Sequence, residues 1–428
     1  IHLSNEGLRG NGEFTYLTSR SKAQDIIFHP DSLMTRASEF NIQKQVSGVQ
    51  YPMVSSSMND VLWYPYRDTM LIDKGDRPFT ILNDTTMLSG SLVLTPVGLS
   101  GEGRMELTNS VLESDYYTYT AYVFDSDTAD FRLKSINTDG FTLITDNMRA
   151  HVDFEDRSGI FQTNEDFSLV EFPENKYISR LDLFTWDMDE AVLYMGSASA
   201  TDYAPEIDTL ADGEQVMVGP RYISVDPYQD SLSFVSNRAV YDYSRNIIRG
   251  SHVTFLRVAD VYIYPHDGEV TIDPDGGMRE FSAANIIANR KTRLHELYEA
   301  SVKVLGKMNY TGSADYDYID ETGEPQQIRF HEITVDDSIN TVARGIIGVD
   351  RDFTLSPQYA YQGRVELYAP NSFLTFDGGA KIFHDCKNNE NNYMKFKAEI
   401  DPEDIYIPVP EQPQDINMNY IYSGTYIS

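Results

Sequence analysis

The segment His295-Glu296-Leu297-Tyr298-Glu299 contains residue types that bind and activate zinc in many hydrolases. Such a site needs two histidines four positions apart on one helix face, with a glutamate between them as general base. Glu299 stands where the second histidine is required. The alternative interpretation is a charged run on the protein surface, and the spacing favours that alternative.

Nucleophilic and nucleotide chemistry find little support in the sequence. Cys386, the one cysteine of the chain, lies two residues from His384. The pair has the residue types of a Cys–His catalytic couple, but an ordinary free thiol is favoured. A single cysteine excludes an internal disulfide framework and a cysteine-rich metal site. The chain also lacks a G-x-x-x-x-G-K-[S/T] phosphate loop and a G-x-S-x-G nucleophile elbow.

Acidic clusters contain the residue types for two further kinds of chemistry, calcium binding and glycoside hydrolysis. Carboxylates two residues apart occur in 125–130 and 315–321, which is a pattern that calcium uses. Neither cluster has the EF-hand spacing, and solvated turns are the favoured interpretation. Paired carboxylates also act as acid and base on polysaccharides, with Trp63 and Trp186 available to stack on sugars. Aromatic residues on strands, however, are more often core or cross-strand partners. We therefore expect no catalytic residue, no metal and no cofactor.

Composition narrows the possible partners. The 428 residues include 34 Lys and Arg against 66 Asp and Glu, for a net charge of −32. This excess repels phosphate backbones and anionic lipid surfaces, so nucleic acid is excluded as a partner. Hydrophobic residues make up 41% of the chain, which disfavours disorder. No apolar run approaches the ~18 residues of a transmembrane helix, and none is expected.

The elements that must position any site are strands. Segments such as Ser231-Leu232-Ser233-Phe234 and Glu269-Val270-Thr271-Ile272-Asp273 alternate apolar and polar residues and are separated by Asp-Gly turns. Strands of this kind recur every ~8–12 residues, which predicts an all-β protein. Only 279–289 and 291–304 compete as helices, and for the second the sequence leaves helix and strand open. We expect at most one short helix.

An internal repeat organises the first half of the chain. Gly7-Leu8-Arg9-Gly10-Asn11-Gly12 is matched by Gly98-Leu99-Ser100-Gly101-Glu102-Gly103, and flanking apolar positions keep nearly the same offset. We predict two tandem β-repeat units of about 90 residues in 1–200, a second β-repeat region in 201–400 and a Pro-rich terminal segment in 401–428. Stacked repeats bury a continuous core, so the expected architecture is elongated: a β-solenoid, a β-taco or stacked jelly-roll modules. The absence of an initial Met and of a leader predicts a mature form or an excised fragment.

One region resembles a known family. Residues 231–265, with Ala239-Val240-Tyr241-Asp242 and Gly250-Ser251-His252-Val253, resemble the repeat of OstA-like β-jellyroll proteins. The whole chain is similar to the long, uncharacterised β-repeat proteins of the Bacteroidota cell envelope. The first resemblance implies a lipopolysaccharide-transport role along an apolar groove. The second implies export to the periplasm, outer membrane or cell surface.

Seven triplets of the form Asp-(Ser/Thr)-apolar or Asp-(Ser/Thr)-Thr resemble the O-glycosylation acceptor of exported Bacteroidota proteins. The structural alternative is that Asp followed by Ser or Thr marks the turns that lead into strands. Both interpretations stay open. The candidate acceptors are Ser32, Thr69, Thr85, Thr128, Thr209, Ser231 and Ser338.

These observations favour a non-enzymatic structural, bridging or binding scaffold of the bacterial cell envelope. Its expected partners are other cell-envelope proteins, with glycan or lipid as further candidates. The first alternative is an envelope lipid or lipopolysaccharide transport component. The second alternative is a glycan-binding or glycan-degrading β-helix protein.

Overall fold

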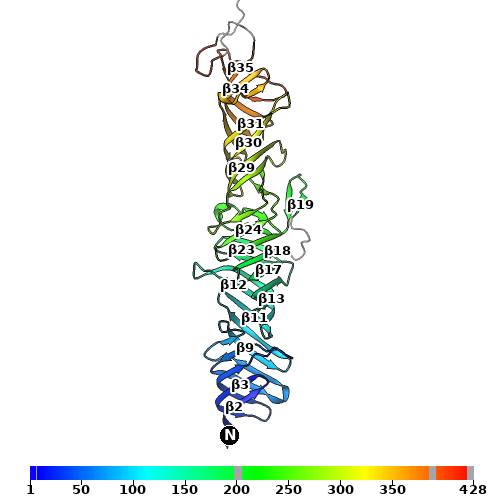
Figure 1. Cartoon of the computed structure of the whole chain (residues 1–428), viewed down its shortest axis with the longest axis vertical. Helices are drawn as coiled ribbons and strands as arrows, with labels where there is room; N and C mark the ends of the chain where they lie inside the picture. Colours follow the sequence, from blue (N-terminus) through cyan, green and yellow to red (C-terminus); the bar gives the residue numbers. More distant parts are fainter. Residues whose placement is uncertain (6, 197–204, 385–391, 422–428) are drawn as a thin grey trace, which may run out of the picture. The chain divides into compact units, whose positions relative to one another are not determined.

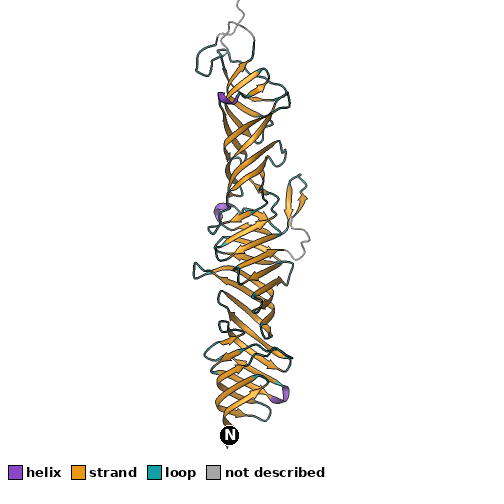
Figure 2. Cartoon of the chain, viewed as in Figure 1, coloured by secondary structure: helices purple, strands orange, loops and turns teal. Residues whose placement is uncertain are grey.

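The computed structural model describes residues 1–5, 7–196, 205–384 and 392–421. Strands account for 61% of the structure, and the described residues contain no helix of seven residues or more. The described residues contain three short 3-10 turns, drawn in purple among the strands in Figure 2. They are η1 (Pro65–Arg67), η2 (Pro227–Gln229) and η3 (Val349–Arg351). The all-β class predicted from the alternation of apolar and polar residues is confirmed.

The chain divides into two compact units. Unit 1 consists of Ile1–Tyr203, Asn237–Arg249 and Pro274–Gly276, and unit 2 of Ala204–Ser236, Gly250–Asp273 and Gly277–Ser428. The division of the sequence into 1–200, 201–400 and 401–428, with two repeats in the first part, stays a prediction.

Unit 1 is built from antiparallel strands, some of which are labelled in Figure 1. Their bounds are β1 (His2–Ser4), β2 (Gly7–Tyr16), β3 (Ser19–Phe28), β4 (Leu33–Ile42), β5 (Val54–Ser56), β6 (Asn59–Tyr64), β7 (Thr69–Asp73), β8 (Phe79–Ile81), β9 (Met87–Thr95), β10 (Gly98–Glu106), β11 (Ser110–Tyr119), β12 (Val123–Lys134), β13 (Phe141–Asp153), β14 (Ser158–Thr163), β15 (Ser168–Phe172), β16 (Tyr177–Leu181), β17 (Leu183–Asp187), β18 (Val192–Gly196) and β23 (Arg238–Asp242). β24 (Ile247–Ser251) follows, and its first three residues belong to this unit.

Six of these strands close into a small barrel. The hydrogen-bonded order is β4-β5-β8-β9-β7-β6 and back to β4. Phe40 of β4 and Phe79 of β8 are fully buried, with ring centroids 6.5 Å apart in an edge-on arrangement. Closure leaves no unpaired strand edge within the ring, and the apolar residues of the inward face fill it. The structure also contains a half-barrel. The elongated repeat architecture expected from the sequence, a β-solenoid, a β-taco or stacked jelly-roll modules, stays a prediction.

The long strand β13 divides the sheet that follows the barrel. Its first part pairs with β15 through Ile144 and Thr145, and its second part pairs with β14 from Met148 onward. Asn147 lies between the two parts with a φ of +55°, a left-handed conformation that asparagine tolerates better than most residues. From β14 the sheet continues through β17 and β18 to β23.

Unit 2 contains a second, ten-strand antiparallel path and a separate hairpin. The path runs β25-β26-β28-β29-β30-β31-β32-β34-β35-β36, with β33 paired to β34. The bounds are β19 (Glu206–Thr209) and β20 (Gln215–Val218) for the hairpin, β21 (Arg221–Ser224), β22 (Ser233–Val235), β25 (Leu256–Val258), β26 (Val261–Tyr264), β27 (Val270–Ile272), β28 (Phe281–Ala288), β29 (His295–Gly306), β30 (Asn309–Ile319), β31 (Pro325–Val335), β32 (Thr341–Ile347), β33 (Thr354–Ser356), β34 (Tyr359–Tyr368), β35 (Leu374–Ile382) and β36 (Met394–Ile400).

Both stretches that compete as helices in the sequence are strands. In β28 the register shifts around Ala283, and in β29 it shifts around Glu299; both residues have positive φ. Each β-bulge adds one residue to its strand. Buried residues normally occur at every second position, but at the bulge two successive buried residues are three positions apart. The spacing of His295, Leu297 and Ala300 therefore imitates a helical period while the backbone stays extended.

Candidate functional site

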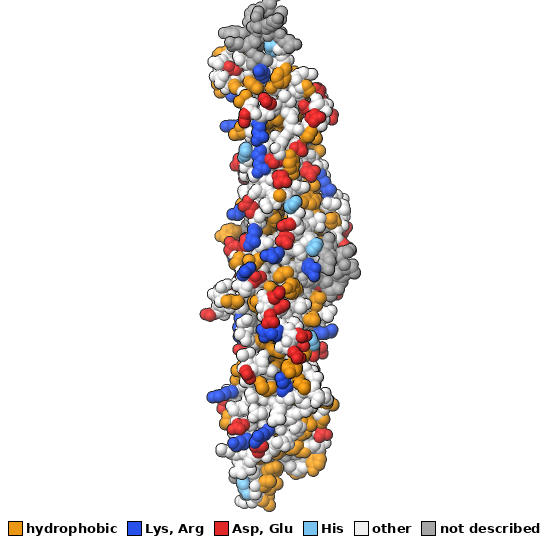
Figure 3. Space-filling view, in the orientation of Figure 1, with side chains coloured by type: hydrophobic (Ala, Val, Ile, Leu, Met, Phe, Trp, Pro, Cys, Tyr) orange, Lys and Arg blue, Asp and Glu red, His pale blue; other side chains and the backbone are white. Residues whose placement is uncertain are grey.

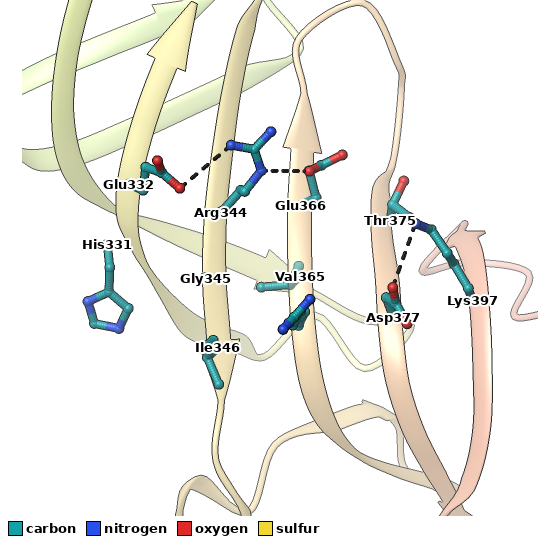
Figure 4. Close-up of a pocket in the computed structure, with 11 residues that line it drawn as sticks. His331, Glu332, Arg344, Gly345, Ile346, Val365, Glu366, Thr375, Asp377 and Lys397 are labelled. Carbon is teal, nitrogen blue, oxygen red and sulfur yellow. Dashed lines mark hydrogen bonds and ion pairs between the residues drawn. The ribbon is translucent and has the colours of Figure 1, made fainter. Parts of the chain in front are cut away.

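Five neighbouring strands of unit 2 present charged side chains on one outer face. The register places Glu332 of β31, Arg344 of β32 and Glu366 of β34 opposite one another. Two residues along, it aligns Ile346, Arg364, Asp377 and Lys397. We call these residues, together with Thr375, the charged face; they line an open depression of about 390 Å³ (Figure 4).

Ion pairs connect the charged face across its strands. Arg344 lies between two carboxylates, with its Nε 3.0 Å from Glu366 Oε2 and its Nη1 3.6 Å from Glu332 Oε2. Lys397 Nζ lies 3.6 Å from Asp377 Oδ2. These side chains are solvent-accessible, so each pair contributes about 0–1 kcal/mol to stability. The ion pairs hold each charged side chain at a defined position on the outer face.

The opposite surface of the same strands anchors this pattern in the core. Val365, Leu367 and Phe376 are 0–1% exposed and alternate with the outward charges. This alternation follows from the two-residue period of a strand, and a slip of one residue would bury the charges.

A glycine pair shapes the backbone beside Arg364. Gly363 and Gly378 lie opposite each other, Gly363 has a φ of +147°, and a Cβ on Gly378 would collide with the Gln362 carbonyl oxygen. Only glycine fits both requirements. The Tyr361 hydroxyl fills the space and donates a hydrogen bond to the Arg364 carbonyl oxygen at 2.5 Å. The backbone that presents Arg364 is thereby held by a buried aromatic side chain.

The arrangement is suited to binding and poorly suited to glycoside hydrolysis. A hydrolase holds one carboxyl group protonated, usually by apolar burial, beside a second that is ionised. Glu332 and Glu366 instead share one guanidinium and remain open to solvent. An ordered pattern of alternating charges is what a complementary surface recognises.

His295 lies in the core. The interpretation of this segment as a surface charge run is therefore wrong for His295. It is 1% exposed, and its Nε2 donates a hydrogen bond to the Asn371 carbonyl oxygen at 2.8 Å. Burial lowers the pKa of His295, partly opposed by that hydrogen bond. Alternation on β29 places Glu296 on the exposed side, so the two residues point to opposite faces of the strand.

The two acidic clusters are engaged by neighbours on their own sheets. Asp125 pairs with His151 at 2.6 Å, and Asp315 with Arg329 at 3.0 Å. Asp317 accepts a hydrogen bond from the Tyr298 hydroxyl at 2.6 Å. Within the described part of the chain, no three His, Cys, Asp or Glu residues gather as metal ligands do. Cys386 lies outside the described residues.

Both tryptophans pack with other aromatic residues. Trp186 is 3% exposed and donates through Nε1 to the Tyr243 hydroxyl at 3.1 Å. Trp63 lies against Tyr16, with ring centroids 5.2 Å apart, and stacks parallel to Phe14. These contacts match the interpretation of aromatic residues as core and cross-strand partners.

The seven candidate acceptors of O-glycosylation are all at least partly exposed. Most lie in turns or at strand ends; Thr128 lies on β12 at an irregularity in its pairing with β13. Asp68 and Asp230, which precede Thr69 and Ser231, adopt left-handed backbone conformations at the ends of η1 and η2. The turn interpretation and the glycosylation interpretation are therefore compatible, and glycosylation stays a prediction. The exposed or half-buried positions are Ser32, Thr69, Thr85, Thr128, Thr209, Ser231 and Ser338.

Sequence reasoning missed a buried polar network in unit 1. Tyr241 and Thr142 are hydrogen-bonded hydroxyls, and Asn246 accepts from Thr142 at 2.9 Å and donates to Glu174. Burial raises the pKa of Tyr241. Tyr241 and Asn246 are 5 positions apart, but Tyr241 lies 99 positions from Thr142 and Asn246 lies 72 positions from Glu174, so the network requires segments distant in sequence to come together. The only available signal was the presence of polar residues at positions that alternation predicts to be buried.

Comparison with known proteins gives no match to a family model, to a curated protein or to a solved structure. In the described residues, no helix is long and apolar enough to cross a membrane.

Proposed function

We propose that this chain is a non-enzymatic scaffold of the bacterial cell envelope that binds another envelope protein through the charged face. The observation that carries this proposal is the charge ladder of Glu332, Arg344 and Glu366, which is set on rigid strands and fully paired. Paired charges on a fixed backbone lose little conformational freedom on binding.

Ile346 gives this face an apolar centre. It lies in the row of Arg364, Asp377 and Lys397, directly opposite Arg364, and is 68% exposed, whereas the residues on either side of it along β32 are buried. An exposed apolar residue surrounded by polar groups has the anatomy of a protein interface, with a dehydrated centre and a polar rim. The partner expected here is a protein with a small apolar pocket and complementary charges around it.

The filled barrel of unit 1 bears on the transport alternative. Lipid transport requires a continuous apolar trough, but the inward side chains of the barrel pack against one another, Phe40 against Phe79 among them. The glycan-degrading alternative requires an acid and a base in different environments. Glu332 and Glu366 of the charged face instead lie in similar environments, because both pair with Arg344. Both arguments favour the scaffold.

The test is purification of the chain from native membranes with the proteins that remain bound to it, together with an assay for release of reducing sugar from envelope polysaccharide. We expect one or more envelope proteins in amounts comparable with the chain and no sugar release. Sugar release above that of a mock purification, or the recovery of no envelope protein, would contradict the proposal.

A further inference from the structure

A second pocket, elsewhere in unit 2, is lined by four cations. Arg221, Arg257, Arg290 and Lys307 surround a space of about 400 Å³ that also contacts Ser231 and Ser233. None of the lining residues is acidic. Such a concentration of positive charge contrasts with a chain in which acidic residues outnumber Lys and Arg by 66 to 34.

The main chain fixes the position of Lys307. Its N–H donates to the Gln229 carbonyl oxygen at 2.9 Å, and its carbonyl oxygen accepts from the Ala259 N–H at 2.8 Å. Gly306 allows this close approach, since a Cβ there would lie 3.2 Å from the Gln229 Cα. The turn between β29 and β30 is thereby attached to η2 and to the end of β25. Because these bonds use only backbone atoms, the side chain of Lys307 is not needed to hold the turn.

Glu214 fixes the two central arginines. Its carboxylate pairs with Arg257 and lies 3.3 Å from Arg290 Nη1, while its side chain is only 8% exposed. A second acid, Asp260, interacts electrostatically with Arg290. Asp260 also accepts hydrogen bonds from the N–H and hydroxyl of Thr341.

The arginines retain unused hydrogen-bonding capacity. In the described structure, the Nε atoms of Arg257 and Arg290 are buried and have no hydrogen-bond partner. A buried donor without a partner costs about 1–3 kcal/mol, and more when it is charged. Natural proteins keep few such donors, and each one that persists calls for a structural or functional reason.

The chemistry of the pocket indicates the class of ligand. Guanidinium groups bind phosphate and carboxylate oxygens through paired N–H donors, and serine hydroxyls add further donors. Glu214 lies between Arg257 and Arg290, and none of the lining residues is acidic, so the pocket presents a cationic surface that suits a phosphate monoester of charge about −1.5 to −2. A space of this size falls in the range of small-molecule pockets and exceeds the needs of a bare ion. We propose that this pocket binds the phosphate group of a phosphorylated small molecule or headgroup.

The experiment is calorimetric titration of the chain with inorganic phosphate, a hexose phosphate and a soluble short-chain phosphatidic acid, with the unphosphorylated hexose as reference. We expect saturable binding of at least one phosphate compound and none of the hexose. The compound that binds most tightly shows whether the natural ligand is free phosphate, a phosphorylated sugar or a lipid headgroup. Affinity should fall with added salt because part of the attraction is long-range.

The variant Lys307→Gln provides the decisive comparison, with Lys303→Gln as its matched control. Both lysines are exposed and both substitutions remove one charge, but Lys303 lies on β29 away from the pocket lining. Lys307→Gln should weaken phosphate binding about tenfold, the value of one charge-assisted hydrogen bond. Lys303→Gln should leave the affinity within about twofold of the original protein. Absence of binding at millimolar phosphate, or equal weakening by both variants, would overturn the proposal.

Discussion

The buried histidine of β29 links the folding of unit 2 to pH. His295 is almost inaccessible to solvent, and burial lowers its pKa below the ordinary value near 6.5. The folded state therefore binds a proton less readily than the unfolded state. Stability from this residue is fully present at neutral pH and is lost as the pH falls below about 6.5.

We predict that His295→Gln flattens this pH dependence. The free energy of unfolding of the original protein should decrease between about pH 7 and pH 5.5, and the decrease should be smaller in the variant because glutamine carries no titrating group. Urea unfolding followed by circular dichroism measures both values. The matched control, His331→Gln, replaces an exposed histidine and should retain the full decrease. Equal slopes in His295→Gln and the original protein would contradict the assignment.

At the scale of elements, the six-stranded barrel of unit 1 depends on a short strand to close its ring. Phe79 is fully buried on the three-residue strand β8, which closes the ring between β5 and β9. So short a strand contributes few ladder hydrogen bonds, so its attachment depends on the aromatic side chain packed against Phe40.

We predict that Phe79→Ala lowers the free energy of unfolding of unit 1 by about 3–5 kcal/mol, as expected for removal of a buried aromatic ring. Both tryptophans of the chain, Trp63 and Trp186, belong to unit 1, so fluorescence follows this unit selectively. Tyr66→Ala, which removes a ring that is 85% exposed, should change the value by less than about 0.5 kcal/mol. A loss below about 1 kcal/mol for Phe79→Ala would show that the barrel does not depend on this contact.

Strands are the part of this fold that a single sequence predicts well. The alternation of apolar and polar residues in 231–234 and 269–273 identifies β22 and β27, although all three residues of β27 are buried. Alternation fails where a bulge inserts a residue, as at Ala283 and Glu299, and there strand imitates helix. It also gives no information on which strands pair. β6 pairs with β4 and β7 with β9, and this choice depends on side-chain packing across the closed ring.

The candidate sites were hidden from the sequence for the same reason. The charged face brings together residues between Glu332 and Lys397 from five strands, and no short motif contains them. The basic pocket likewise combines Arg221 with Lys307, which lie 86 positions apart. Their types are common on any surface, and only the register of the sheets gives them a shared location.

At the scale of the whole molecule, the net charge of −32 is distributed rather than gathered in one region. Figure 3 shows acidic and basic side chains interspersed on the visible face. Ion pairs such as Arg36 with Asp76 and Arg157 with Asp189 occur on outer surfaces. Against this distribution, the basic pocket is a local exception.

Glycosylation is a further prediction for the whole molecule. If the Asp-(Ser/Thr) triplets are acceptors, the chain isolated from its native host should be heavier than its sequence predicts by whole sugar units. Intact-mass spectrometry measures this difference. Replacement of the seven Ser and Thr acceptors by Ala should return the mass to the value calculated from the sequence. A native mass equal to that value would contradict glycosylation, and only the turn interpretation would remain.

The central claim, that the charged face binds an envelope protein, is tested most directly by co-purification of variants from native membranes. Ile346→Asp places a charge at the apolar centre, and Ile319→Asp makes the same change at another exposed isoleucine of unit 2. We predict that Ile346→Asp reduces the recovered partner at least about tenfold, as for loss of an interface anchor, while Ile319→Asp recovers it fully. Equal recovery of the partner with both variants would contradict the claim.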